Sequence, residues 1–260
     1  MKYTEETINT ARQLYKELKS LRKVSKLVNI PRNVLTELLK ESGACIQPSC
    51  RDLKPVFNES VFNSIDTEEK AYWLGFLEAD GYLSKDNSLR LELAEKDLEH
   101  LIKFCVFFNY PVSRITYRTD KNTYFININS IQLSKDLKKL NFKSEKHPLK
   151  NISKEYIKYY IRGFFDGDGS IYGVGVASFS TSIIAKIEYL KSFSEYLPLS
   201  TFKYRKVNSS NVEIYRLETK GIIESLKLST YLYDNSKIHL TRKYEKYLKY
   251  KLLLGKNFND

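Results

Sequence analysis

One apolar, glycine-containing segment that ends in an acid and a glycine occurs twice in the chain. The first copy is Trp73–Ser84, WLGFLEADGYLS, and the second is Ile161–Tyr172, IRGFFDGDGSIY. Gly163 lies 88 positions after Gly75, and the same spacing separates the acids that close the two copies. A motif repeated at one long spacing indicates a duplicated structural unit, in which each copy presents the same helix end.

Small residues predict that the two motif helices pack closely. Positions four apart share one face of an α-helix, so each motif places two small residues on one stripe. Facing stripes of this kind allow two helix backbones to approach. The residues expected at this contact are Gly75, Ala79, Gly163 and Gly167.

The acids that end the motif helices predict a metal site. Packed side by side, the helices bring Asp80 and Asp168 together at their negative ends, where the two charges repel. Mg²⁺ removes that cost and favours carboxylates, water and phosphate oxygens; Mn²⁺ and Ca²⁺ can take the same ligands. Gly81 and Gly169 follow the acids, where a left-handed or otherwise permissive conformation costs little, and are included in the expected site. The alternative is two ordinary buried helices with capping acids.

These motifs resemble the two signature motifs of monomeric LAGLIDADG homing endonucleases. The resemblance rests on GFLEADG and GFFDGDG at matched spacing and covers roughly residues 60–250. It implies that the second acid of each motif, Asp80 or Asp168, binds catalytic metal. The first motif departs from the family pattern with Glu78 in place of the first Asp and with Trp73-Leu74-Gly75 as its opening. The second opens with Ile161-Arg162-Gly163. These departures lie outside the metal-binding acids, so cleavage is still expected.

Two lysines complete the expected catalytic set. The resemblance implies a basic residue after the last helix of each repeat, and Lys146 and Lys243 are the candidates by position. A lysine there can polarise the phosphate or orient water. Because lysine is abundant in this chain, position alone distinguishes these two only weakly.

The hydrophobic patterns around the motifs predict an α+β fold with two pseudo-symmetric repeats. Residues 67–147 and 148–260 each read as αββαββα, and the second repeat ends in a basic helix. Each repeat is expected to form an antiparallel sheet with one face on its helices and the other free, the two repeats packing through the motif helices. The expected elements include strands Ser113–Arg118 and Val176–Ser180, and helix Ser182–Leu197.

Residues 1–43 predict a separate helical unit. Ser20 is a suitable cap for a short helix, Asn29–Pro31 interrupt the helical pattern, and Gly43 ends the next helix. The pattern resembles a helix-turn-helix of the resolvase or recombinase type; a helical hairpin that only packs is the alternative. Residues 44–66, with two prolines, are expected to form a linker. The DNA contacts implied for this unit are Arg32, Asn33 and Thr36.

A net charge of +12 favours a polyanionic partner. On the predicted strands, Arg, Lys, Asn and Thr alternate with apolar residues, and Arg suits guanine whereas Asn suits adenine. A polar strand face that is only hydrated is the alternative. The DNA contacts expected in the repeats are Ser84, Arg90, Arg114, Thr116, Arg118, Asn127, Asn129, Tyr172, Ser178, Lys203 and Arg205.

Cysteine usage and hydropathy predict an intracellular protein. Cys45, Cys50 and Cys105 are odd in number and lack zinc-binding spacing, which indicates reduced thiols. No apolar run is long enough to span a membrane, and the first residues lack the pattern of a secretory signal. Bacterial or phage-encoded cytoplasmic proteins and organellar proteins both fit, and a monomer is expected.

These observations predict a site-specific homing endonuclease. It would hydrolyse phosphodiester bonds in both strands of a long double-stranded DNA target with the help of Mg²⁺. The resemblance also implies short 3′ overhangs and a gene that lies within an intron or intein or stands free. Because no protein-splicing signature is evident, an intron-encoded or free-standing gene is expected. Two alternatives use the same scaffold: a maturase that binds intron RNA, and a catalytically inactive DNA-binding regulator. The presence of both Asp80 and Asp168 favours cleavage.

Overall fold

The computed structural model describes residues 3–44, 46, 55–144, 149–173, 178–207 and 213–257. The chain divides into two compact units, Met1–Val56 and Phe57–Asp260. The expected linker 44–66 is therefore too long at its carboxyl end. Val61 and Phe62 are buried in the core of the second unit, so residues 57–66 belong to that unit.

The amino-terminal unit consists of three helices around a small apolar core. The Ser20 hydroxyl accepts a hydrogen bond from the Lys23 amide at 3.4 Å, as a helix cap does. Asn29 and Gly43 have φ values of 51° and 75°, a left-handed conformation that ends a helix readily. The helices are α1 (Glu5–Leu18), α2 (Leu21–Leu27) and α3 (Arg32–Glu41), and the core residues are Ala11, Tyr15, Val24, Ile30, Leu35 and Leu39.

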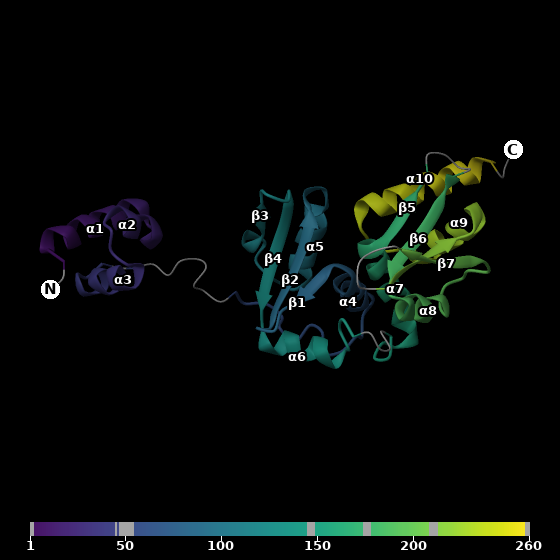
Figure 1. Ribbon diagram of the computed structural model, residues 1–260, viewed down its shortest axis with the longest axis horizontal. Helices are drawn as coiled ribbons and strands as arrows, with labels where there is room; N and C mark the ends of the chain where they lie inside the picture. Colours follow the sequence, from purple (N-terminus) through teal and green to yellow (C-terminus); the bar gives the residue numbers. More distant parts are fainter. Residues whose placement is uncertain are drawn as a thin grey trace. The chain divides into compact units, whose positions relative to one another are not determined.

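The first repeat has the predicted αββαββα order (Figure 1). Its four strands form an antiparallel sheet in the order β1-β2-β4-β3. The elements are α4 (Glu68–Asp80), β1 (Gly81–Leu83), β2 (Ser88–Ala94), α5 (Leu98–Phe107), β3 (Thr116–Arg118), β4 (Thr123–Asn129) and α6 (Ile131–Lys139), with short 3₁₀ turns at Glu95–Asp97 and Val112–Arg114.

The second repeat copies this order and adds a terminal helix. Its sheet, β5-β6-β8-β7, is also antiparallel and matches the first strand for strand. The predicted α+β fold with two equivalent repeats is therefore confirmed. The elements are α7 (Lys154–Asp168), β5 (Gly169–Tyr172), β6 (Ser180–Ala185), α8 (Ile187–Ser194), β7 (Phe202–Val207), β8 (Ile214–Thr219), α9 (Gly221–Tyr233) and α10 (Thr241–Asn257).

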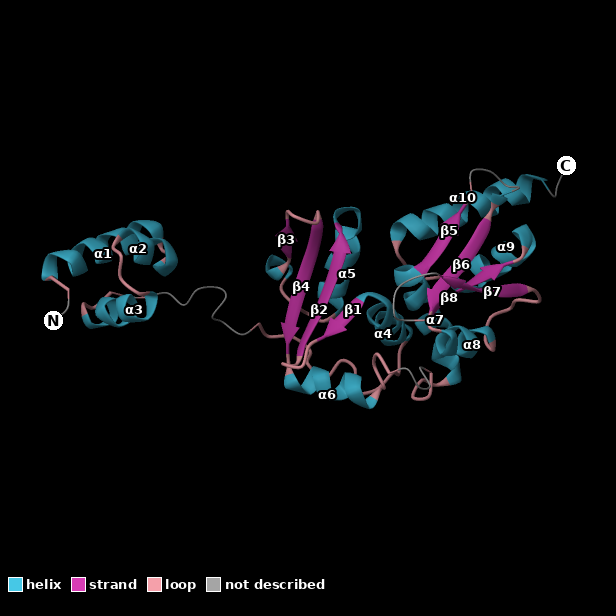
Figure 2. Ribbon diagram, in the orientation of Figure 1, coloured by secondary structure: helices cyan, strands magenta, loops and turns pink. Residues whose placement is uncertain are grey.

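The motif helices α4 and α7 pack against each other between the two sheets (Figure 2). Every residue of α4 from Ala71 to Glu78 is buried. A helix that is apolar on all sides is stable only inside a protein core, which explains why this segment lacks a polar face. The pair joins the two repeats into one unit.

Each sheet turns one face to the helices and leaves the other open. In β2, Leu89, Leu91 and Leu93 are buried, whereas the residues between them point away from the core. Cross-strand pairing places Arg90 opposite Asn127. We call the face that carries Arg90 in the first sheet, and Lys203 and Arg205 in the second, the outer face.

One strand and one helix of the second repeat were predicted wrongly. The expected helix Ser182–Leu197 starts later, because Ser180–Ala185 forms strand β6 and the helix begins only at Ile187. The expected strand Val176–Ser180 overlaps β6 at Ser180 alone, and residues 174–177 lie outside the described residues. β-branched residues in Ser180–Ala185 favour a strand, and pairing with β5 and β8 fixes it.

The expected strand Ser113–Arg118 is shorter than predicted. Val112–Arg114 forms a 3₁₀ turn, and only Thr116–Arg118 pairs with β4. Thr116 and Arg118 lie on the outer face as expected, whereas Arg114 precedes the sheet.

Candidate active site

Glycines bring the backbones of α4 and α7 into direct contact. A Cβ atom added at Gly75 would lie 2.0 Å from the carbonyl oxygen of Tyr160, and one added at Gly163 would lie 1.9 Å from that of Tyr72. At Gly167 it would lie 2.3 Å from the Cβ atom of Ala79. No side chain fits at these distances, so the expected contact residues do form the helix contact.

Gly81 and Gly169 are required for space and not for a left-handed backbone. Their φ values are −75° and −87°, which corrects the expectation of a left-handed conformation. Added Cβ atoms would lie 2.6 Å from the carbonyl oxygen of Leu77 and 2.5 Å from that of Phe165. Each helix therefore passes directly into the first strand of its sheet, and each final helical residue is the acid of the motif.

Asp80 and Asp168 end the two contacting helices. Within the described part of the chain, neither carboxylate has a hydrogen-bond or ion-pair partner, and no third His, Cys, Asp or Glu joins them as a metal ligand. Both side chains retain solvent access. Burial by the surrounding protein, followed by the charge of Asp168, raises the pKa of Asp80 to about 6. Burial also raises the pKa of Asp168, which nearby lysines partly offset.

Lys243 closes the carboxyl end of α7. Its buried Nζ donates to the carbonyl oxygens of Phe165 at 2.6 Å, Asp166 at 2.7 Å and Gly169 at 2.6 Å, with Gly167 at 3.3 Å. An ammonium group at this end satisfies carbonyls that have no partner within the helix and favours the negative pole of the helix dipole. Burial lowers the pKa of Lys243 to about 8.

Lys143 has the equivalent position at α4. Its Nζ donates to the carbonyl oxygens of Glu78 and Ala79, the second at 3.0 Å. These residues precede Asp166 and Gly167 by 88 positions, so the two lysines bind equivalent carbonyls. Sequence reasoning missed Lys143, and the expected Lys146 lies outside the described residues. The high lysine content left no signal that separates the two.

The first acid of each motif binds a tyrosine from the opposite repeat. Asp166 is fully buried and accepts hydrogen bonds from the hydroxyls of Tyr72 at 2.7 Å and Tyr233 at 2.5 Å, and from the Leu240 amide at 2.7 Å. Burial raises the pKa of Asp166. This acid therefore holds α4, α9 and the segment before α10 together.

Glu78 makes the reciprocal connection. It accepts hydrogen bonds from the Tyr189 hydroxyl at 2.5 Å and from the Lys143 amide at 2.8 Å. Burial raises the pKa of Glu78 as well. The first acids are thus occupied in joining the repeats, whereas the second acids, Asp80 and Asp168, have no such partner among the described residues.

Two solved structures have a fold similar to that of this chain. I-SmaMI bound to an uncleaved DNA target in the presence of calcium ions has a TM-score of 0.51 and 15% identity, over 72% of this chain and 92% of that one. The I-LtrWI LAGLIDADG homing endonuclease bound to target DNA has a TM-score of 0.50 and 14% identity, over 78% and 92%. The chain has the LAGLIDADG homing endonuclease fold.

Sequence comparisons add one relative without an assigned activity. The uncharacterized protein MJ0398 of Methanocaldococcus jannaschii is 25% identical over 201 residues, which cover 70% of each chain. No family model matches the chain.

The outer faces of the LAGLIDADG sheets carry most of the expected DNA contacts. Ser84 lies in the β1–β2 turn, where its Oγ accepts from the Ser88 amide at 3.1 Å, and Ser178 lies before β6. Arg114 is off the sheet. On the outer faces lie Arg90, Thr116, Arg118, Asn127, Asn129, Tyr172, Lys203 and Arg205.

The three-helix unit presents its expected contacts at the start of α3. Arg32 and Asn33 are exposed. The hydroxyl of half-buried Thr36 donates to the Arg32 carbonyl oxygen at 2.7 Å, so its donor is engaged. The helix-turn-helix interpretation of residues 1–43 stays a prediction.

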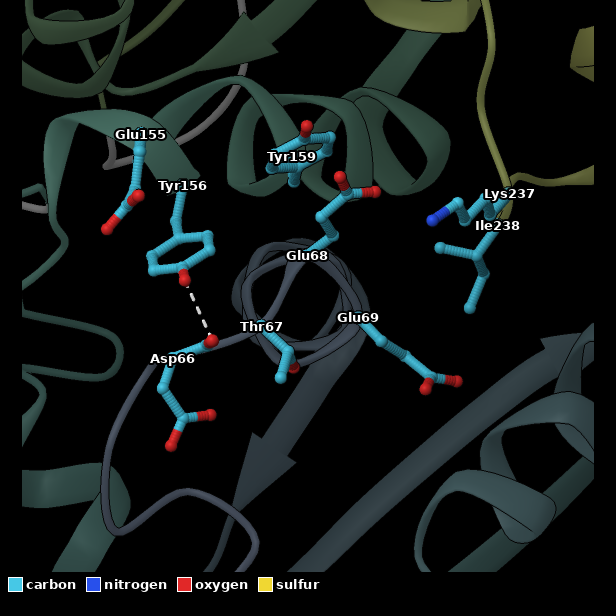
Figure 3. A pocket seen from close by; sticks show the side chains of 9 residues that line it. All are labelled: Asp66, Thr67, Glu68, Glu69, Glu155, Tyr156, Tyr159, Lys237 and Ile238. Carbon is cyan, nitrogen blue, oxygen red and sulfur yellow. Dashed lines mark hydrogen bonds between the residues drawn. The ribbon is translucent and has the colours of Figure 1, made fainter.

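A pocket of about 650 Å³ lies at the amino-terminal ends of α4 and α7 (Figure 3). Asp80 and Asp168 are at the other ends of these helices. Tyr156 donates to the carbonyl oxygen of Asp66 at 2.7 Å on one wall. Four acids in its lining make it unsuitable for a phosphate. The lining residues are Asp66, Thr67, Glu68, Glu69, Glu155, Tyr156, Tyr159, Lys237 and Ile238. None of the helices in the described part of the chain has the length and apolar character needed to cross a membrane.

Proposed function

We propose that this chain is a site-specific DNA endonuclease that cuts both strands of a long duplex target in the presence of a divalent cation. The observation that carries the proposal is the pair Asp80 and Asp168. They end two helices in backbone contact, they influence each other electrostatically, and they lack protein partners within the described residues. Two adjacent carboxylates without protein partners repel each other and do not stabilise the fold, so we infer that they bind a ligand.

The donor set fits a hard divalent cation. Asp80 and Asp168 would hold it, leaving positions for water and phosphate oxygens, as Mg²⁺ prefers. When bound, such a cation stabilises negative charge on the phosphate and lowers the pKa of bound water. Lys143 and Lys243 fix the helix ends through carbonyl oxygens, so their role here is to position the two acids. Gly81 and Gly169 provide the sharp passage from helix to strand.

The outer faces support duplex DNA as the substrate. Exposed Asn127, Asn129, Lys203 and Arg205 suit base edges in the major groove. The net charge of +12 supplies attraction to phosphates. Two proteins with this fold are bound to DNA targets. In the proposed function, the amino-terminal unit contacts DNA beside the target through Arg32 and Asn33.

A plasmid library of candidate targets tests the proposal. We expect linear product with Mg²⁺ and none with a chelator. Asp80→Asn and Asp168→Asn should each lower double-strand cleavage at least about 100-fold, because an amide cannot replace the anionic ligand. Binding to the selected target should persist in both variants, as measured by gel shift.

Asp66→Asn is the matched control. Asp66 precedes the same helix α4 at the end remote from Asp80 and pairs with Lys70, so this variant should cut at the wild-type rate. If Asp80→Asn and Asp168→Asn both cut DNA at the wild-type rate, the assignment of these acids as the metal site is wrong. Specific binding without cleavage by the wild-type chain would favour a regulator, and selective binding of structured intron RNA would favour a maturase.

A further inference from the structure

Each sheet carries a glutamate on its outer face. Glu92 lies in β2 of the first sheet, with 23% of its side chain exposed, and Glu218 lies in β8 of the second, with 12% exposed. A carboxylate repels phosphates, so it weakens a surface that binds DNA through charge alone. A glutamate on both outer faces therefore needs a function that compensates for the weaker attraction to phosphates.

Glu218 is surrounded by three cationic side chains. Its carboxylate lies 3.2 Å from Nζ of Lys203, 3.5 Å from Nε of Arg205 and 3.6 Å from Nη1 of Arg216. The strand register sets Arg205 directly opposite Arg216, an arrangement in which like charges repel. Glu218 offsets that repulsion and holds both guanidinium groups close to one point.

Glu92 holds Arg90 with two hydrogen bonds. Nη2 and Nε of Arg90 donate to the same oxygen at 2.7 and 3.1 Å. The other oxygen accepts from the Thr123 hydroxyl at 2.6 Å and lies 3.7 Å from Nη1 of Arg118. The guanidinium of Arg90 also lies 4.1 Å from the centre of the Phe125 ring. Arg90 is therefore fixed on two sides.

We propose that Glu92 and Glu218 are specificity-determining residues that orient arginines of the outer faces toward guanine. This inference rests on the proposed DNA-binding function. Recognition of O6 and N7 of guanine needs a guanidinium in one orientation, whereas a phosphate accepts many. A glutamate that orients an arginine also removes one unit of charge from sequence-independent binding. Both effects increase the difference between the target and other DNA.

Binding by the full chain, with metal chelated to prevent cleavage, tests the inference. The wild-type protein first selects duplexes from a randomised pool. Dissociation constants are then measured for the selected duplex and for a scrambled one at several salt concentrations. Glu218→Gln and Glu92→Gln should each lower the ratio of specific to non-specific affinity about tenfold. Non-specific binding should tighten, and its dependence on salt should become steeper.

Glu213→Gln is the matched control. Glu213 adjoins β8 and pairs with Lys206, whose strand position alternates with those of Lys203 and Arg205, so it lies outside the Glu218 cluster. It loses the same charge and should keep the wild-type ratio and the wild-type selected sequence. Pools reselected with Glu218→Gln and Glu92→Gln should relax at G·C positions that the wild-type and Glu213→Gln proteins keep.

Arg216→Lys provides a second route if Glu218→Gln disturbs the sheet in a thermal melt. It keeps the charge but loses the planar fork, so specificity at the same G·C positions should fall while non-specific affinity stays constant. Unchanged ratios and selected sequences in all three variants would reject the inference and leave the proposed function intact. A wild-type protein that selects no sequence would overturn both.

Discussion

The two repeats share their order of elements but differ in how firmly each motif helix is held. In the second repeat, Asp166 accepts three hydrogen bonds and Lys243 reaches four carbonyl oxygens. In the first, Glu78 accepts two, and Lys143 reaches two carbonyl oxygens. The acids that end the helices are alike in both repeats. Only what supports these acids differs.

The difference comes from the extra helix of the second repeat. Lys243 lies in α10, and Leu240 lies just before it, so a whole element covers the end of α7. Lys143 follows α6 in a turn from which the chain proceeds to α7. Lys243 is therefore carried by a helix and Lys143 by a turn. The acid that ends the motif helix is thus the same in both repeats, whereas the residues that hold the helix end differ between them.

The largest expected effect is equal in the two repeats. Gly75→Leu and Gly163→Leu should each prevent folding of the Phe57–Asp260 unit, because a side chain would meet a carbonyl oxygen of the other motif helix at about 2 Å. Circular dichroism and a thermal melt should show loss of the cooperative transition of that unit. Gly255→Leu is the control, since nothing lies within 4 Å of an added Cβ atom there. Folding of only one glycine variant would show that the helix contact is not symmetric.

The helix contact could be predicted from sequence because it depends on local spacing. Glycines four residues from a small residue, repeated at one interval, specify which faces meet. The roles of Glu78 and Asp166 could not be predicted, since their tyrosine partners are distant in the chain. Tyr189, for example, follows Glu78 by 111 residues. Lys143 was missed for the same reason: which lysine reaches the end of α4 depends on the path of the turn after α6.

Strand β6 shows a different limit of sequence reasoning. Ser182 resembles a helix cap, and apolar residues after it recur at helical spacing. Pairing with β5 and β8 instead makes this segment a strand as far as Ala185. The outcome therefore depends on partners outside the segment.

A smaller effect should separate the repeats. Lys243→Met should lower the free energy of unfolding by about 3 kcal/mol, because several buried carbonyl oxygens lose their donor. Lys143→Met should cost about 1 kcal/mol, because fewer carbonyls are affected. Urea denaturation measures both. Lys251→Met is the control: it lies in the same helix as Lys243 but forms a surface pair with Asp234, worth less than about 1 kcal/mol. Equal losses at the two lysines would contradict the difference in support.

An effect that depends on pH concerns His100, which contacts Tyr72, the tyrosine bound to Asp166. Its Nε2 lies 3.0 Å from the Tyr72 hydroxyl. Since the single hydroxyl hydrogen of Tyr72 goes to Asp166, Nε2–H of His100 is the donor to Tyr72. The Nδ1 atom is buried without a partner among the described residues. Burial, followed by nearby positive charges, lowers the pKa of His100 from 6.5 to about 3.

This shift predicts a loss of stability in mild acid. The unfolded chain binds a proton at His100 before the folded chain does, so the stability due to neutral His100 is complete above pH 6.5 and falls as the pH approaches 3. By pH 5 the loss should reach about 2 kcal/mol. The free energy of unfolding of His100→Gln, measured by urea denaturation at each pH, should fall less steeply over this range. The acids whose pKa is raised are present in both the wild-type protein and His100→Gln, and so is His239, whose pKa burial lowers to about 4. Their contributions therefore cancel when the two stability curves are compared. Parallel curves would show that the Tyr72–Asp166 contact does not depend on the protonation of His100.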